Sequence, residues 1–180
     1  QNKKLIYFLG FINTQGIAIS FMPFVLLYSK EIFNANSNDT GTFLISKIIG
    51  VVTVSLFVLL FSSKIKYNFL LYLNVFLSIG LAIMVLITND IAIIKFAFIL
   101  GGITFSLYNI SMNGILLEVS GLENRALYAG FAGAGNILPA LFPLIGGWII
   151  QQWSFPAFFI VFIFILSCSL FFIQRMHCTK

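Results

Sequence analysis

The chain has 180 residues, of which 60% are hydrophobic and 8% are charged, and its formal net charge is +5. Soluble domains carry about 25% charged residues, so this composition leaves too few polar side chains to cover a water-exposed surface. It excludes a soluble enzyme, a disordered tail and a disulfide-stapled secreted domain, and it indicates an integral membrane protein in contact with the lipid bilayer. The basic residues are scattered among apolar runs and form no patch for nucleic acid.

Six apolar runs are long enough to cross the membrane as helices, which takes about 20 residues each. They are expected at residues 5–28, 42–61, 69–88, 91–117, 127–150 and 155–173. The spacers between them are short and polar, so successive helices should be antiparallel neighbours in a single all-α bundle. Because the chain does not begin with Met, we expect it to be a fragment of a longer protein.

The basic residues of the short spacers predict the orientation in the membrane. One side would carry Lys3, Lys4, Lys64, Lys66, Arg125, Arg175 and Lys180, whereas the clear charge on the other side is Lys30. Since Lys and Arg concentrate in cytoplasmic loops, both termini should be cytoplasmic. We expect a multi-pass protein of the bacterial inner (plasma) membrane.

Glycines and polar residues concentrate in the first, fourth and fifth runs, whose polar faces should turn toward protein or water. In the fourth run, Gly102, Ser106, Asn109 and Asn113 step by four, three and four, so they share one helix face, with Tyr108 at an adjacent angle. Two side-chain amides one turn apart favour hydrogen bonding to a solute. Helix–helix packing explains the same stripe, because small residues and Asn also mediate contacts between membrane helices.

The first two runs supply further candidates for a solute-binding site. Asn13 and Gln15 lie at mid-depth in the first run but project about 200° apart, so they can face one cavity only if the helix unwinds. Pro23 follows and predicts a kink. Lys47 lies inside the second run, where a buried lysine is costly. It either binds an anionic solute or a carboxylate, or extends to the outer membrane surface.

The fifth run combines small residues with two prolines. Gly130 and Gly133 belong to four-residue repeats of Gly and Ala that allow close packing. Asn136 follows and is a further candidate for solute binding. Pro139 and Pro143 then predict a bent outer half, which would serve close packing or act as a gate.

Two cytoplasmic loops carry charges of both signs and form a possible gate at the inner mouth. The residues are Lys64, Lys66, Glu118, Glu123 and Arg125. Their ion pairs would hold the mouth closed in one state. Alternatively, the basic residues only set the topology, and exposed pairs contribute about 0–1 kcal/mol.

Enzyme chemistry finds no support. His177 lies in the tail, and Asp39 and Asp90 lie in outside loops, so neither a Ser-His pair nor a paired aspartate site can form within the membrane. There is no metal-ligand cluster and no phosphate-binding glycine loop, so we expect neither a catalytic residue nor a metal or cofactor.

The fifth run is preceded by Glu123-Asn124-Arg125-Ala126-Leu127-Tyr128-Ala129-Gly130 and continues with Pro139, Pro143 and Ile145-Gly146-Gly147-Trp148. This pattern resembles the tenth-to-eleventh loop and eleventh helix of major facilitator superfamily transporters. The whole chain looks like their carboxy-terminal six-helix half. One departure lies in residues 61–68, where the family often has glycines and an acid and this chain keeps only the basic residues.

The resemblance implies half of a twelve-helix fold, built from two inverted three-helix repeats. It implies a secondary active transporter that moves a small organic solute by alternating access, together with its amino-terminal half in cis or a second copy. Because the composition is rich in phenylalanine, hydrophobic drugs are a second class of possible substrate. The alternatives are a permease subunit of an ATP-binding-cassette importer, whose loop spacing this chain does not match, and a non-transporting membrane scaffold.

Overall fold

The structure is a computed structural model, and it describes residues 3–61, 67–120 and 125–176, without the side chains of residues 3, 4, 118, 119, 125, 127, 128 and 131. Its described elements are helices and no strand. In chain order they are α1 (Lys3–Gln15), the 3-10 helix η1 (Gly16–Ser20), α2 (Phe21–Phe33), α3 (Ser37–Phe61), α4 (Tyr67–Ile87), α5 (Ile91–Ser120), α6 (Arg125–Ala134), α7 (Ile137–Gln152) and α8 (Phe155–Met176).

Six helical segments are long and apolar enough to cross a membrane, which confirms the predicted all-α fold with six transmembrane helices. α1, η1 and α2 together form the first span, and α6 with α7 forms the fifth. The first span ends at Phe33 rather than at residue 28, and the second begins at Ser37 rather than at residue 42.

The turn between the first two spans is tight because both helix ends are capped. Asn34 ends α2 in the left-handed conformation, with φ 52°, which asparagine tolerates well. At the start of α3, the backbone N–H of Asn36 donates to Asp39 Oδ2 (3.1 Å) and the N–H of Asp39 donates to Asn36 Oδ1 (3.0 Å). This reciprocal capping starts α3 at Ser37, five residues before the predicted start of the second span.

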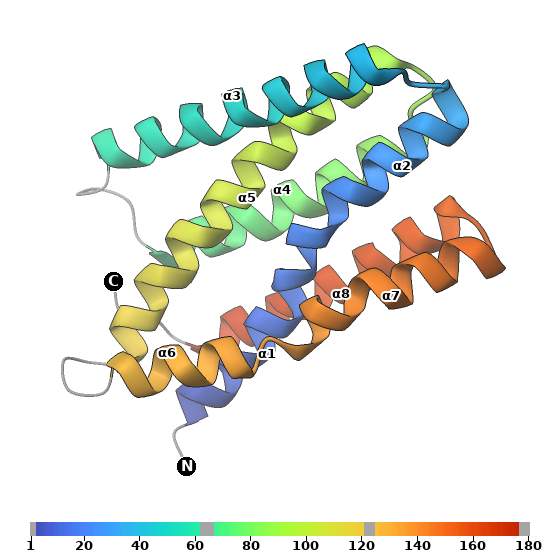
Figure 1. Ribbon diagram of the computed structural model, residues 1–180. Coiled ribbons are helices and arrows are strands. Elements are labelled where there is room, and N and C mark those ends of the chain that lie inside the picture. Colours follow the sequence, from blue (N-terminus) through green and yellow to red (C-terminus); the bar gives the residue numbers. More distant parts are fainter. Residues whose placement is uncertain (1–2, 62–66, 121–124, 177–180) are drawn as a thin grey trace.

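The main contacts between helices are symmetric: they stay the same when the first three spans are exchanged with the last three. α8 packs along α1, and α5 packs along α4; α5 also packs along α3, and α7 along η1; α4 and α8 pack against each other. Exchanging spans one and four, two and five, and three and six turns the first pair into the second and the third pair into the fourth, and it leaves the α4–α8 pair unchanged. The pattern is that of two inverted three-helix repeats. In Figure 1, α3 lies at one edge of the bundle and α7 and α8 lie at the opposite edge.

Aromatic side chains fill the interior between α2, α7 and α8. Phe21 stacks on Phe162 with ring centroids 4.2 Å apart, and Phe24 lies 4.5 Å from Phe158. Phe142 from α7 completes this cluster. These buried rings pack against one another, so part of the high phenylalanine content serves helix packing.

Candidate functional site

α3 and α5 approach each other closely because each carries a glycine at their crossing. A Cβ added at Gly50 would overlap the carbonyl of Ile99, and one added at Gly102 would overlap the carbonyl of Lys47. One turn further along α5, the hydroxyls of Ser106 and Ser55 lie 2.8 Å apart. Two members of the predicted stripe, Gly102 and Ser106, therefore pack against α3.

The other side of α5 is covered by the first span. Tyr108 is buried, and its hydroxyl lies next to Gly16 of η1, whose added Cβ would be 3.2 Å from that oxygen. Gly101 faces Met22 of α2. α5 is thus held between α3 on one side and the η1–α2 segment on the other.

Between these two packed sides, α5 leaves a strip open. It consists of Phe105, Asn109 and Asn113, which recur every fourth residue and so lie above one another. Phe105 and Asn113 are exposed and Asn109 is half-buried. The amide of Asn109 donates to the carbonyl of Phe105 at 2.8 Å, which leaves its oxygen directed away from that bond. The predicted amides Asn109 and Asn113 are therefore on the open surface.

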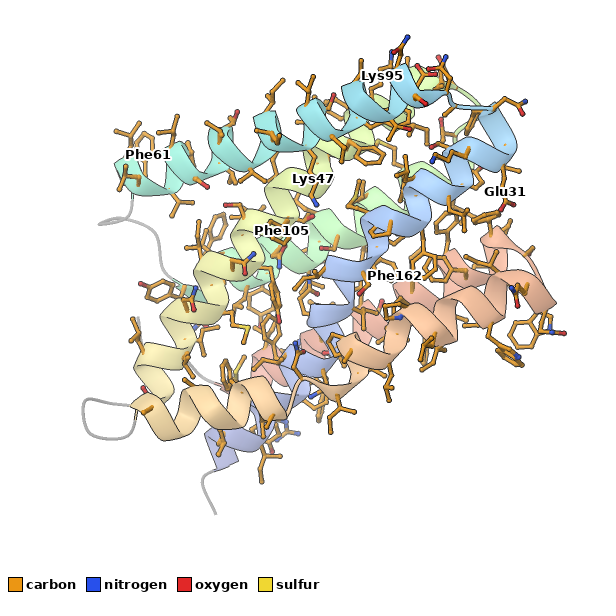
Figure 2. All side chains as sticks on the ribbon, viewed as in Figure 1. Glu31, Lys47, Phe61, Lys95, Phe105 and Phe162 are labelled. Atoms are coloured by element: carbon orange, nitrogen blue, oxygen red, sulfur yellow. The ribbon has the colours of Figure 1, made fainter. Side chains whose placement is uncertain are left out.

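Lys47 joins this strip from α3. Its ammonium lies over the ring of Phe105, 5.1 Å from the ring centroid. Phe105 was not predicted, although its position four residues before Asn109 places it on the same face. Figure 2 shows Lys47 and Phe105 in the middle of the bundle, far from the ends of α3 and α5. We call Lys47, Phe105, Asn109 and Asn113 the open face.

The depth of Lys47 bears on its two sequence interpretations. α3 begins at Ser37, ten residues earlier, which corresponds to about 15 Å along the helix. Phe105 lies near the centre of the 30-residue α5. The ammonium is held against a ring at mid-depth instead of extending toward the outer surface, so the contact favours the binding interpretation.

Asn13 connects α1 to a break in the fifth span. Its amide nitrogen donates to the carbonyl of Gly135 (2.6 Å) and to that of Leu9 (2.9 Å), while its oxygen accepts from the N–H of Leu138 (2.9 Å). In an unbroken helix the Gly135 carbonyl would accept from residue 139, but Pro139 has no N–H. Asn13 therefore replaces helix hydrogen bonds that the break between α6 and α7 removes.

The break in the fifth span meets the 3-10 segment of the first. A Cβ at Gly16 would lie 2.6 Å from Pro139 Cγ and 3.3 Å from Asn136 Oδ1. The Asn136 oxygen and the Tyr108 hydroxyl are both buried without a hydrogen-bond partner among the described residues. Two interrupted helices and two unpaired oxygens thus converge beside Gly16, on the flank of the open face.

Gln15 points elsewhere. It is fully buried, its amide nitrogen donates to Ser78 Oγ of α4 (3.1 Å), and its oxygen accepts from Ser169 of α8 (3.4 Å). Asn13 therefore contacts the fifth span, whereas Gln15 contacts α4 and α8, in agreement with the angle of about 200° between their side chains. Asn74, one turn before Ser78, is also buried, and neither of its amide atoms has a partner among the described residues.

The chain as a whole matches one family. The family model of the Major Facilitator Superfamily covers residues 6–177. The chain belongs to the major facilitator superfamily. Because that superfamily consists of transporters, the chain is an integral, multi-pass membrane protein of the transporter class. No curated protein sequence matches the chain.

Superfamily membership confirms the resemblance read from the fifth span and leaves the importer-permease and scaffold alternatives without support. The proposed cytoplasmic gate stays a prediction. Lys64, Lys66 and Glu123 lie outside the described residues, and so do the side chains of Glu118 and Arg125.

The three predicted kink positions differ in their surroundings. Pro23 lies in the first turn of α2, directly after η1, and Pro139 lies in the first turn of α7, directly after the break. Each therefore follows an interruption of the α-helix. Pro143 lies inside α7, which continues past it to Gln152.

Proposed function

We propose that the chain is one six-span unit of a secondary active transporter that moves a small organic solute or drug by alternating access. The observation that carries the proposal is the open face: an ammonium, an aromatic ring and an amide side by side at mid-depth on membrane-spanning helices. The ammonium and the amide are costly against hydrocarbon, so they favour a water-filled path. Moving a solute along that path makes and breaks no covalent bond.

We further propose that a second six-span unit covers this path, either the amino-terminal half of the same protein or a second copy. α3, which carries Lys47 of the open face, and the fifth span are the least buried of the six spans. Their exposed side chains offer surface for such a unit as well as for lipid. In this arrangement the two units rock against each other around the solute.

We propose that the interrupted helices assist this rocking. η1 and the α6–α7 break lie against each other at Gly16 and Pro139. A helix with missing backbone hydrogen bonds bends more easily than an intact one. Asn13 would keep the two interruptions together while the units move.

In the orientation that we propose, both termini lie on the cytoplasmic side of a bacterial inner membrane, because the basic spacer residues concentrate on that side. The turn at residues 34–36 then faces outward. A cysteine at Ser37 is therefore expected to react with a membrane-impermeant reagent added from outside.

The double variant Asn109→Ala, Asn113→Ala is expected to lower transport by about tenfold or more, because each lost hydrogen bond to a solute weakens its binding. The measurement is solute-specific uptake into proteoliposomes containing the intact protein, with a panel of labelled organic solutes. Ser167→Ala is the matched control, since Ser167 is exposed on α8 and, like Asn109, bonds to a carbonyl of its own helix. Unchanged uptake by the double variant would contradict the role of the open face.

A further inference from the structure

We propose that the transported solute is a small organic anion whose negative group pairs with the ammonium of Lys47. This inference rests on the proposed transport function and adds the charge of the solute. It is carried by the position of Lys47 on the open face and by the charges that surround it.

The charged side chains that the structure describes elsewhere lie toward the ends of the spans. The cations Lys30, Lys95 and Arg175 are near the ends of α2, α5 and α8. The carboxylates Glu31, Asp39 and Asp90 lie near helix ends as well. Figure 2 shows Glu31 and Lys95 toward the end of the bundle, away from Lys47. Among the described residues, the middle of the open face is therefore positive and has no carboxylate to balance it.

The contact with Phe105 leaves the ammonium available to a ligand. A ring face attracts a cation without accepting its N–H groups as a carboxylate would. The three donors of Lys47 can therefore turn toward an incoming anion, and such charge-assisted hydrogen bonds are stronger than neutral ones. Phe105 thus holds the positive charge at mid-depth until the solute arrives.

The rest of the open face sets the size of the solute. Asn109 and Asn113 lie one and two turns beyond Phe105, about 6 and 12 Å along α5. A solute with its anionic group at Lys47 can place an apolar or planar part over the exposed ring of Phe105. Polar atoms at its far end then reach the two amides.

The test compares three probes that share one ring and differ in charge: benzoate, benzamide and benzylamine. Each is added to the intact purified protein, and the ligand-induced rise in its unfolding temperature gives the affinity. We expect benzoate to bind more tightly than the other two. Lys47→Gln should weaken benzoate binding about tenfold or more, and Lys47→Arg should restore it because the charge returns. Lys95→Gln, which removes a lysine near the start of α5, should bind benzoate as the unaltered protein does.

Three results would overturn the inference. The first is that benzoate does not bind, the second that benzamide or benzylamine binds at least as well, and the third that Lys47→Gln binds benzoate normally. A lower unfolding temperature of ligand-free Lys47→Gln, with no benzoate effect in either protein, would mean that Lys47 stabilises the fold and does not bind an anion.

Counterflow of labelled benzoate and benzylamine into proteoliposomes separates this inference from the proposed function. Lys47-dependent binding of benzoate without counterflow would support the anion site and contradict transport. Counterflow of benzylamine that is insensitive to Lys47→Gln would support transport and contradict the anion site.

Discussion

Gly102→Ala is expected to destabilise the protein by about 3 kcal/mol, because the added methyl group overlaps the Lys47 carbonyl and forces α3 away from α5. A change of this size corresponds to a fall of roughly 6–12 °C in the midpoint of thermal unfolding. The midpoint is measured on the detergent-solubilised protein from the amount that stays monodisperse after heating. The same displacement moves Lys47 off Phe105, so loss of stability and loss of benzoate binding should appear together.

Gly80→Ala is the matched control, since an added Cβ at Gly80 of α4 meets no atom within 4 Å. Alanine favours a helix over glycine by about 1 kcal/mol, so this variant should be as stable as the unaltered protein or slightly more stable. If both alanine variants had the same midpoint, α3 and α5 would not be in backbone contact at Gly102.

Asn13→Ala is expected to destabilise the protein by about 2 kcal/mol, because it leaves the Gly135 carbonyl and the Leu138 N–H without their side-chain partner. Asn13→Asp removes only the amide N–H donor of this side chain. The carboxylate can still accept from the Leu138 N–H, but its second oxygen lies against the carbonyl oxygens of Gly135 and Leu9 and is repelled by them. It should therefore be at least as destabilising as the alanine variant. Both midpoints are measured by thermal unfolding in detergent.

Thr14→Ala provides the control for Asn13. The Thr14 hydroxyl donates to the carbonyls of Gly10 and Phe11 in its own helix, so its loss leaves no group of another span unpaired. Its midpoint should change by less than about 2 °C. A fall in Thr14→Ala equal to that of Asn13→Ala would show that the bonds to the fifth span add no stability.

Composition and run length predicted the six spans because the thickness of the bilayer fixes the length of a membrane helix. The ends of the helices were predicted less well. The second span was expected from residue 42, but the reciprocal bonds of Asn36 and Asp39 start α3 at Ser37. An Asn or Ser followed three residues later by an acid is a recognisable start signal, and using it would have moved the predicted start of this helix from residue 42 toward Ser37.

The partners of the polar residues depend on helix approach, which periodicity alone does not give. Spacing placed Gly102, Ser106, Asn109 and Asn113 on one face, but the crossing with α3 divides them into two packed residues and two on the open face. Asn13 and Gln15 were placed on opposite sides of one helix, yet their partners on the fifth span, α4 and α8 come from distant parts of the chain. Phe105 was missed because the stripe was traced through small and polar residues alone, although its spacing of four residues from Asn109 places it on the same face.

If the open face lines a water-filled path, a cysteine on it should react with a water-soluble thiol reagent. In a chain with Cys168 and Cys178 replaced by Ser, single cysteines are placed at Ser37, Asn109 and Phe76, and membranes open to both sides are treated with a charged, membrane-impermeant thiol reagent. Ser37→Cys in the first turn of α3 should react, and Phe76→Cys, exposed near the middle of α4, should stay unreacted in lipid. We expect Asn109→Cys to react; an Asn109→Cys as unreactive as Phe76→Cys would contradict a water-filled path along the open face.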